Sequence, residues 1–222
     1  MSNNDTSSIN NTMTTLKRLT FKNLGDKVPR RGGTIAPPIA RCLFKLLGWK
    51  AVGEIPNVPK AIFLALPHTS NFDGFYAIPL ILGLDLDMKI MGKDSLFKNP
   101  VLASFFTWAG IIPINRSKKG SVLQASIERM KSSEALFLGL SPEGTREYTD
   151  KWKTGFYYIA DGAQVPIVPV AMDYKTKQIR FLKPVYTTGD YDKDLVKILA
   201  QYKGVVPKHP DKMSQLLKNL NK

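Results

Sequence analysis

The apolar run Ala61-Ile62-Phe63-Leu64-Ala65-Leu66 leads directly into the polar stretch Pro67-His68-Thr69-Ser70-Asn71-Phe72-Asp73. A short apolar run closed by a proline is typical of a buried strand, and a Thr-Ser-Asn segment can cap the start of a helix. The two stretches therefore predict a strand, a turn that carries His68, and a helix with Asp73 in its first turn. On one straight helix the two side chains would point about 140° apart, so they can meet only if His68 precedes the helix.

His68 and Asp73 are candidates for a base and its carboxylate partner. An unperturbed imidazole titrates at about pH 6.5, so a neutral histidine can accept a proton at physiological pH when a carboxylate fixes its tautomer. A structural interpretation fits the same residues, because the helix dipole favours an aspartate in a first turn and a histidine after a strand is often only hydrogen-bonded. The pair alone leaves both interpretations open.

Strand and helix patterns alternate through the rest of the chain. A helix is expected from about residue 71, a second opens at Ser121 with a capping-box pattern, and an aromatic-rich segment spans 96–108. This alternation predicts an α/β fold, a single domain whose mostly parallel central sheet is flanked by helices. Further strands are predicted at 88–91, 111–114, 135–140, 165–172 and 178–186.

The two ends of the chain carry amphipathic patterns. Ile39, Leu43 and Leu46 share one helical face beside basic residues, and stripes within 195–202 and 213–220 repeat the arrangement. Packing onto the domain and contact with a membrane both fit such faces. We therefore divide the chain into three parts. Residues 1–33 are predicted to form a flexible basic arm, and residues 34–55 an amphipathic helical segment for which membrane contact is one role. Residues 56–222 are predicted to form a main domain that ends in basic helices.

Charge and cysteine content narrow the class of protein. The net charge of +14 is concentrated at the two ends, because residues 1–60 and 175–222 each carry +7 whereas 61–174 is neutral. Such basic ends suit binding to an anionic membrane surface or to nucleic acid.

The single cysteine, Cys42, excludes an intrachain disulfide, and two histidines form no Cys/His cluster, so we expect neither a metal site nor a cofactor. No signal peptide or transmembrane run is expected, which favours a cytoplasmic protein held peripherally on the cytoplasmic face of a membrane.

Three polar segments that follow predicted strands are candidates for one site. They are His68 to Asp73, Gly110 to Arg116, and Pro142-Glu143-Gly144-Thr145-Arg146. Open α/β sheets bind ligands beyond the carboxyl ends of their strands, so these segments can gather at one edge. Two arginines suit a phosphate group, a glycine lets the backbone approach a ligand closely, and a base with a partner suits proton removal from a hydroxyl.

In these segments the chain resembles the glycerolipid acyltransferases typified by 1-acyl-sn-glycerol-3-phosphate acyltransferase. The H-x4-D motif of that family matches His68 and Asp73, its glycine-rich second motif matches Gly110 to Arg116, and its P-E-G-T-R motif matches Pro142 to Arg146. A fourth, proline-containing apolar motif is similar to residues 165–170. The chain departs from the family pattern beside the motifs, at Pro67, Asn115 and Ser141.

The resemblance implies acyl transfer from an acyl thioester, carried by coenzyme A or acyl carrier protein, to the free hydroxyl of a lysophospholipid such as 1-acylglycerol-3-phosphate. His68 would be the general base, Asp73 would orient it, and 56–222 would be the acyltransferase domain. Backbone N–H groups of the 68–73 turn would stabilise the oxyanion, and residues 96–108 would line an acyl-chain groove or belong to the core. The implied substrate-binding residues are Arg116, Glu143, Gly144, Thr145 and Arg146.

Other functions stay open beside this one. The chain could acylate a different lysolipid or amphiphilic acceptor, bind lipid without catalysis, or bind nucleic acid through its basic ends. No helix-turn-helix, zinc-finger or RNP-like pattern is visible, so no nucleic acid is expected. The expected partners are an acyl thioester donor, a lysophospholipid acceptor and an anionic membrane surface.

Overall fold

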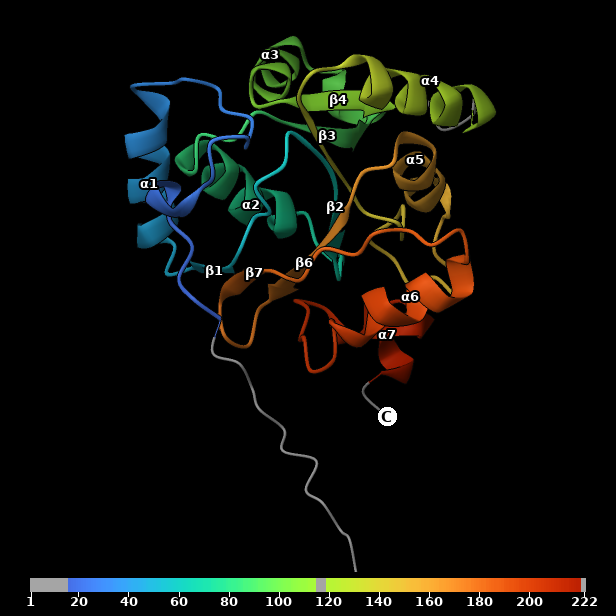
Figure 1. The fold of residues 1–222 in the computed structure, drawn as a ribbon. Helices are drawn as coiled ribbons and strands as arrows, with labels where there is room; N and C mark the ends of the chain where they lie inside the picture. Colours follow the sequence, from blue (N-terminus) through green and yellow to red (C-terminus); the bar gives the residue numbers. More distant parts are fainter. Residues whose placement is uncertain (1–15, 115–118, 221–222) are drawn as a thin grey trace, which may run out of the picture.

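A seven-stranded, mostly parallel sheet forms the centre of the protein (Figure 1). The computed structural model describes residues 16–114 and 119–220. The strand order is β1-β7-β6-β2-β5-β3-β4, and every neighbouring pair is parallel except β6 and β7. The strands are β1 (Lys50–Gly53), β2 (Lys60–Leu66), β3 (Met88–Lys93), β4 (Ile111–Ile114), β5 (Leu136–Leu140), β6 (Ile167–Asp173) and β7 (Gln178–Phe181).

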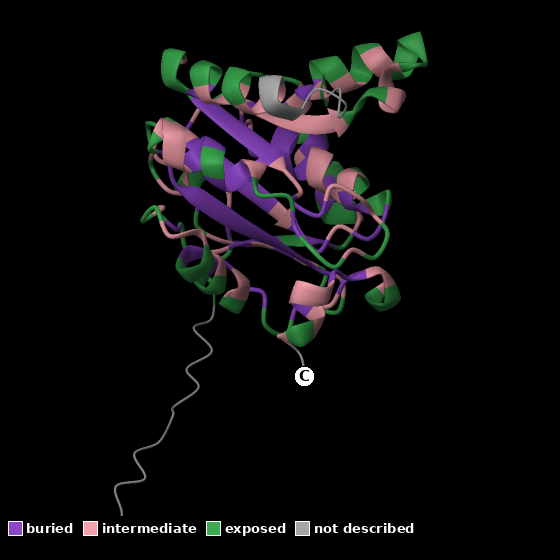
Figure 2. Cartoon of the chain, turned by 90° about the vertical axis from the view of Figure 1, so that its right-hand side faces the viewer, coloured by how far each residue is buried: buried purple, intermediate pink, exposed green. Residues whose placement is uncertain are grey.

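The central strand β2 shows why the apolar run forms a strand. Its side chains alternate between the two faces of the sheet. Ile62, Leu64 and Leu66 belong to one core cluster, whereas Ala61 and Phe63 belong to the other. Because successive side chains of a strand point to opposite faces, a continuous apolar run fits a strand that is covered on both sides. Figure 2 shows that the buried residues follow the strands through the middle of the molecule.

Helices cover both faces of the sheet. On one face of the sheet α1 packs on α2, and Phe44 of α1 and Leu80 of α2 belong to the core cluster of that face. On the other face, residues of α4, α5, α6 and α7 share a core cluster with β2. The predicted α/β fold is thereby confirmed.

In the described part of the chain, no helix combines the length and apolar character needed to cross a bilayer. The helices are α1 (Ala36–Leu46), α2 (Phe72–Gly83), α3 (Pro100–Trp108), α4 (Lys119–Ser132), α5 (Gly155–Ala163), α6 (Tyr191–Ala200) and α7 (Gln215–Asn219), with 3-10 turns η1 (Phe21–Asn23), η2 (Asp94–Phe97) and η3 (Pro210–Lys212).

Some predicted boundaries differ from the structure. β7 ends at Phe181 rather than at residue 186, shortly before Pro184, which cannot donate to a strand ladder. It runs antiparallel to β6 because only a short turn joins the two strands. α4 begins at Lys119, so Ser121 lies inside the helix and not at its cap.

The N-terminal region is packed more closely than the predicted arm implies. Leu19 and Val28 are buried, and the N–H of Leu19 donates to the carbonyl of Ala51 at 2.9 Å. After α1, strand β1 joins the edge of the sheet beside β7. Residues before 56 therefore contribute to the core of the domain, whereas 1–15 lie outside the described residues.

The carboxyl ends of β2, β5 and β6 meet at one edge of the sheet. Leu64 pairs with Leu140, and Leu66 pairs with Ala171, so the segments that follow these three strands emerge next to each other. This topology brings the turn after β2 beside the P-E-G-T-R segment after β5, as the parallel arrangement predicts. The segment after β4 begins at residue 115, outside the described residues.

Candidate functional site

The turn after β2 places an imidazole against a buried carboxylate. His68 Nδ1 lies 2.9 Å from Asp73 Oδ2, and the side chains of His68 and Asp73 are 25% and 2% exposed. His68 precedes α2 and Asp73 lies in its first turn, which is the arrangement that their spacing requires. Since Asp73 holds Nδ1, the other ring nitrogen, Nε2, is the one that can exchange a proton with a substrate.

Further donors hold Asp73 in place. The N–H of Ser70 donates to Oδ2 at 3.0 Å, and the hydroxyl of Tyr174 donates to Oδ1 at 2.6 Å. Burial, together with the contact to Asp73, raises the pKa of the Tyr174 hydroxyl, which keeps it protonated as a donor. Both carboxylate oxygens are therefore engaged, and this fixes the orientation of the carboxylate toward the imidazole.

Sequence reasoning did not include Tyr174 in the site. It follows β6 directly, and its ring centroid lies 4.9 Å from that of Trp49 and 5.9 Å from that of Tyr76. Tyr76 also stacks on Trp49, with 4.4 Å between ring centroids. A polar side chain just after a parallel strand is the only signal that could have pointed to Tyr174.

The carboxylate of Glu143 holds the backbone of the turn that carries His68. Glu143 is 4% exposed, and its Oε2 accepts the N–H of His68 at 2.7 Å. Burial raises the pKa of this carboxyl, and the N–H of His68 and the neighbouring Ser214 oppose that rise. Its Oε1 is buried without a hydrogen bond to a described residue. The geometry thus shows Glu143 bound to the backbone that carries the candidate base, and the substrate contact that the resemblance implied stays a prediction.

The rest of the P-E-G-T-R segment forms a tight turn. Gly144 has a φ of +65°, a conformation that favours glycine, and a Cβ there would lie 2.5 Å from the Nζ of Lys153. The Thr145 hydroxyl accepts a backbone N–H of its own turn at 3.1 Å. Arg146 Nε is buried without a hydrogen bond to a described residue. Arg116 lies outside the described residues, so the convergence of the two arginines stays a prediction.

A pocket of about 600 Å³ lies beside the P-E-G-T-R segment. Its walls come from β3, β4, β5, α4, α5 and the loop between β5 and α5. They are mainly apolar, and Ser141 and Lys153 are among the polar lining residues. No residue of the segment 96–108 lines it, and α3 contains no buried residue. The core interpretation of that segment is therefore wrong, and its place in an acyl-chain groove stays a prediction.

The C-terminal part of the chain returns to the same turn. The N–H of His209 donates to Thr69 Oγ1 at 3.3 Å, and Lys208 Nζ lies 3.3 Å from the ring centroid of Phe72. The two contacting segments are about 140 residues apart in the sequence. No motif marks the 207–210 loop, so the sequence alone could not place Lys208 beside the turn.

Comparison with protein families identifies a match across most of this site. A model of the Acyltransferase family matches residues 51–173, more than half of the chain. The matched range contains His68, Asp73 and the P-E-G-T-R segment, and it ends just before Tyr174.

Individual relatives agree with this family. The 1-acyl-sn-glycerol-3-phosphate acyltransferases of Saccharomyces cerevisiae and Haemophilus influenzae are each 27% identical to the chain. The Saccharomyces match covers 73% of this chain and 61% of the relative, and the Haemophilus match covers 79% of this chain and 80% of the relative. An uncharacterised acyltransferase of Schizosaccharomyces pombe is 31% identical over 54% of the chain and 44% of its own length. The chain thus spans less than two thirds of the two yeast relatives. The crystal structure of the 1-acyl-sn-glycerophosphate acyltransferase PlsC of Thermotoga maritima aligns with a TM-score of 0.51 at 22% identity, over 73% of this chain and 74% of that one, and supports the fold.

Proposed function

Because this chain belongs to the acyltransferase family, we propose that it transfers a fatty acyl group from an acyl thioester to the free hydroxyl of a lysophospholipid. The donor is acyl-coenzyme A or the acyl thioester of acyl carrier protein, and the acceptor is 1-acylglycerol-3-phosphate, as the names of two relatives suggest. The observation that carries the proposal is the 2.9 Å contact of His68 Nδ1 with Asp73, because it leaves a partly exposed ring with one nitrogen free for substrate.

The chemistry assigned to the pair is general base catalysis. The acceptor hydroxyl attacks the thioester carbonyl while His68 Nε2 takes its proton. The resulting tetrahedral oxyanion collapses, the carbon–sulfur bond breaks, and the imidazolium returns the proton to the leaving thiolate. Asp73 stabilises the imidazolium between these steps, as a carboxylate does in other base-carboxylate pairs.

Only part of the 68–73 turn is available to stabilise the oxyanion. A backbone N–H that already donates within the protein cannot also serve a developing charge at full strength. An oxyanion site in this turn would therefore use the N–H of Thr69 or of Asn71. The N–H groups already donated are those of His68, Ser70, Phe72 and Asp73.

We assign the acceptor phosphate to the P-E-G-T-R side of the site. Arg146 provides a forked donor there, Gly144 and Thr145 let the backbone approach, and Arg116 is assigned to the same phosphate on the basis of its motif. Glu143 acts on the substrate indirectly, by holding the N–H of His68. The apolar pocket of about 600 Å³ is assigned to the acyl chain, because it adjoins this segment and its walls are mainly apolar.

An acceptor panel tests the proposed reaction. Thiol release from acyl-coenzyme A should require an acceptor and be fastest with lysophosphatidate. Monoacylglycerol, which lacks the phosphate, should have a kcat/KM lower by about tenfold or more, since a hydrogen bond to a charged group contributes about 1.5–3 kcal/mol. Equal rates with a choline or neutral acceptor would instead favour the second candidate, acylation of a different lysolipid. Absence of acceptor-dependent thiol release throughout the panel, with either donor carrier, would reject the reaction.

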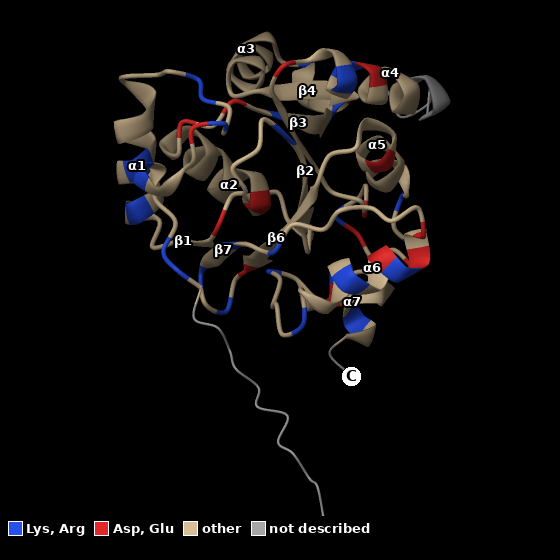
Figure 3. Cartoon of the chain, viewed as in Figure 1, with Lys and Arg blue, Asp and Glu red and all other residues tan. Residues whose placement is uncertain are grey.

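The proposal includes peripheral docking on an anionic membrane through α1. Ile35, Ile39 and Leu46 are 74%, 64% and 79% exposed, and they share one helical face. The guanidinium of Arg31 lies 5.0 Å from the ring centroid of Trp108 and donates to the Trp108 carbonyl at 2.6 Å, which joins the segment before α1 to the end of α3. Figure 3 shows basic and no acidic residues on α1. An apolar face with basic neighbours suits the headgroup region of an anionic bilayer.

The double variant Ile39→Gln, Leu46→Gln tests this docking face. Its affinity for anionic vesicles should fall by at least about tenfold, because transferring one large apolar side chain from water contributes about 1.5–3 kcal/mol. The matched control is Val196→Gln, Tyr186→Gln, which changes two exposed apolar residues near the C-terminal helices. Co-sedimentation measures both. Equal losses in the two variants, or binding that salt does not weaken, would contradict the docking face.

A further inference from the structure

A second, smaller pocket lies on the opposite face of the sheet from the acyl-chain pocket. It has a volume of about 240 Å³ and lies between the segment 18–21, α1 and the carboxyl-terminal half of α2. In α2 the pocket is lined by Pro79, Leu80 and Gly83, which lie about 9–15 Å along the helix axis from Asp73. The floor includes the apolar side chains Phe21, Phe44 and Trp49, and the basic lining residues are Arg18, Arg41, Lys45 and Lys50.

The positive charge of this pocket is uncompensated within the described residues. None of its four cations forms an ion pair with a described carboxylate, and no aspartate or glutamate lines the pocket. The guanidinium of Arg41 is held in place, because it donates to the carbonyl of Gly83 at 3.1 Å and lies 4.2 Å from the ring centroid of Phe21. One fixed and three exposed cations over an apolar floor suit an anionic group that is attached to an apolar body.

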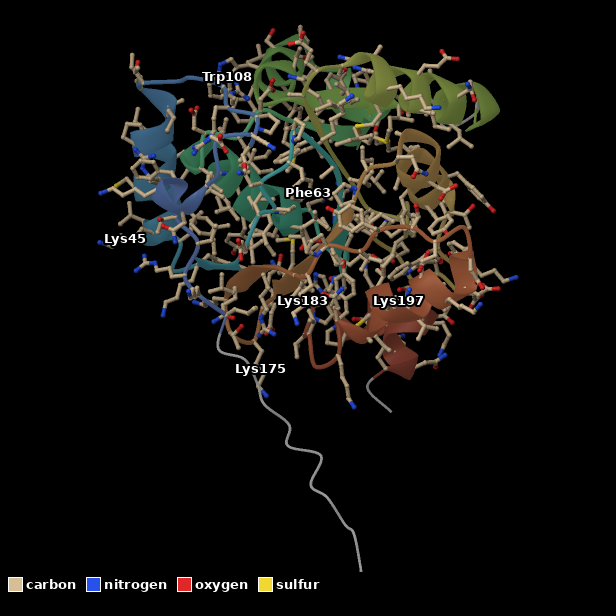
Figure 4. All side chains as sticks on the ribbon, in the orientation of Figure 1. Lys45, Phe63, Trp108, Lys175, Lys183 and Lys197 are labelled. Atoms are coloured by element: carbon tan, nitrogen blue, oxygen red, sulfur yellow. The ribbon has the colours of Figure 1, made fainter. Side chains whose placement is uncertain are left out.

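The pocket adjoins the exposed apolar face of α1. At 100° per residue, Arg41 and Lys45 lie between the exposed face with Ile39 and Leu46 and the buried face with Phe44. Figure 4 shows Lys45 at the outer side of α1, on the left of the view, and Lys183 nearer the centre of the view. When the apolar face enters a bilayer, cations in this position lie at the level of the phosphates.

We propose that this pocket binds the phosphate-bearing headgroup of one anionic phospholipid, whose acyl chains stay in the bilayer beside α1. The inference rests on the membrane docking proposed above and adds a defined lipid site to it. A lipid fits better than a free phosphate ion, because the apolar face of α1 continues from the pocket and gives the acyl chains a surface to contact. The site is distinct from the one assigned to the acceptor.

The double variant Lys45→Gln, Lys50→Gln tests the lipid site. Both lysines are exposed, so the fold should not depend on them, and equal thermal unfolding would verify this. The control variant Lys183→Gln, Lys203→Gln removes the same charge from two exposed positions that do not line the pocket. Co-sedimentation uses vesicles of phosphatidylcholine with phosphatidylglycerol. We expect the first variant to bind about tenfold or more weakly, since each basic residue contributes about 1 kcal/mol at an anionic surface, and the control to bind like the unmodified protein.

Two comparisons decide the outcome. Equal weakening of vesicle binding in both variants would mean that only total charge matters and would overturn the proposed lipid site. Unchanged vesicle binding of the first variant would overturn it too.

Calorimetry with soluble dihexanoyl phosphatidylglycerol and with inorganic phosphate separates binding of a lipid from binding of a free ion. Saturable binding of the lipid that Lys45→Gln, Lys50→Gln weakens supports the site, whereas equally tight binding of phosphate overturns it. If the unmodified protein ignores the vesicles but binds the soluble lipid at this pocket, the docking proposal fails and the headgroup site stands.

Discussion

Replacing His68 by alanine is expected to lower the rate of acceptor-dependent thiol release by about 10²- to 10⁴-fold, the usual contribution of a positioned general base. The loss should fall on kcat with little change in KM, because the ring contacts the hydroxyl proton that moves in the transition state. The side chain is a quarter exposed, so its removal leaves no large cavity and the protein should still fold. Steady-state kinetics with acyl-coenzyme A and lysophosphatidate measures the effect.

The chain offers a matched control for this variant, because it contains only one other histidine. His209 contacts the same turn through its backbone N–H, which His209→Ala retains. That variant should keep the activity of the unmodified protein to within a small factor. A comparable loss in both variants would show that disturbance of the turn, and not removal of a base, accounts for the effect.

Replacing Asp73 by asparagine is expected to be almost as severe, with a loss of about two to four orders of magnitude. Asparagine has nearly the same shape, and its carbonyl can still accept one of the present donors. It cannot hold the Nδ1–H tautomer and stabilise the imidazolium with a negative charge, so Nε2 becomes a poor base. Measurement of kcat for folded Asp73→Asn protein tests this, and activity equal to that of the unmodified protein would contradict the proposed role.

Tyr174→Phe provides the graded comparison for that variant. It removes one donor from Asp73 Oδ1 but leaves the contacts of Oδ2 with His68 and Ser70. A hydrogen bond to a charged group contributes about 1.5–3 kcal/mol net, so a loss of about tenfold to a hundredfold is expected. Tyr174→Phe should therefore rank between the unmodified protein and Asp73→Asn. A larger loss than that of Asp73→Asn would mean that Tyr174, and not the carboxylate, organises the site.

Local patterns were sufficient to predict the centre of this site. The side chains of β2 point alternately into two core clusters, which explains why its apolar run is continuous. A strand buried in this way in a parallel sheet ends in a turn that leads into a helix. The spacing of His68 and Asp73 could then be satisfied in only one local arrangement, which the structure has. Parallel topology placed the P-E-G-T-R segment next to this turn, since β2 and β5 are neighbours.

Contacts between distant segments could not be predicted in this way. Tyr174 reaches Asp73 across 101 residues, and the 207–210 loop reaches Thr69 across 140, so both depend on the complete arrangement of the sheet and its helices. The orientation of Glu143 toward the N–H of His68 likewise needs the register of two strands. The packing of Leu19 and Val28 was missed because single apolar residues in a polar arm carry no periodic signal.

The most direct test of the account compares thiol release from acyl-coenzyme A by the unmodified protein, His68→Ala and Asp73→Asn, with and without lysophosphatidate, in one series of folded preparations. We predict acceptor-dependent release by the unmodified protein and a loss of at least about a hundredfold in each variant. Equal acceptor-dependent rates in all three proteins would contradict the assignment of His68 and Asp73 as the catalytic pair.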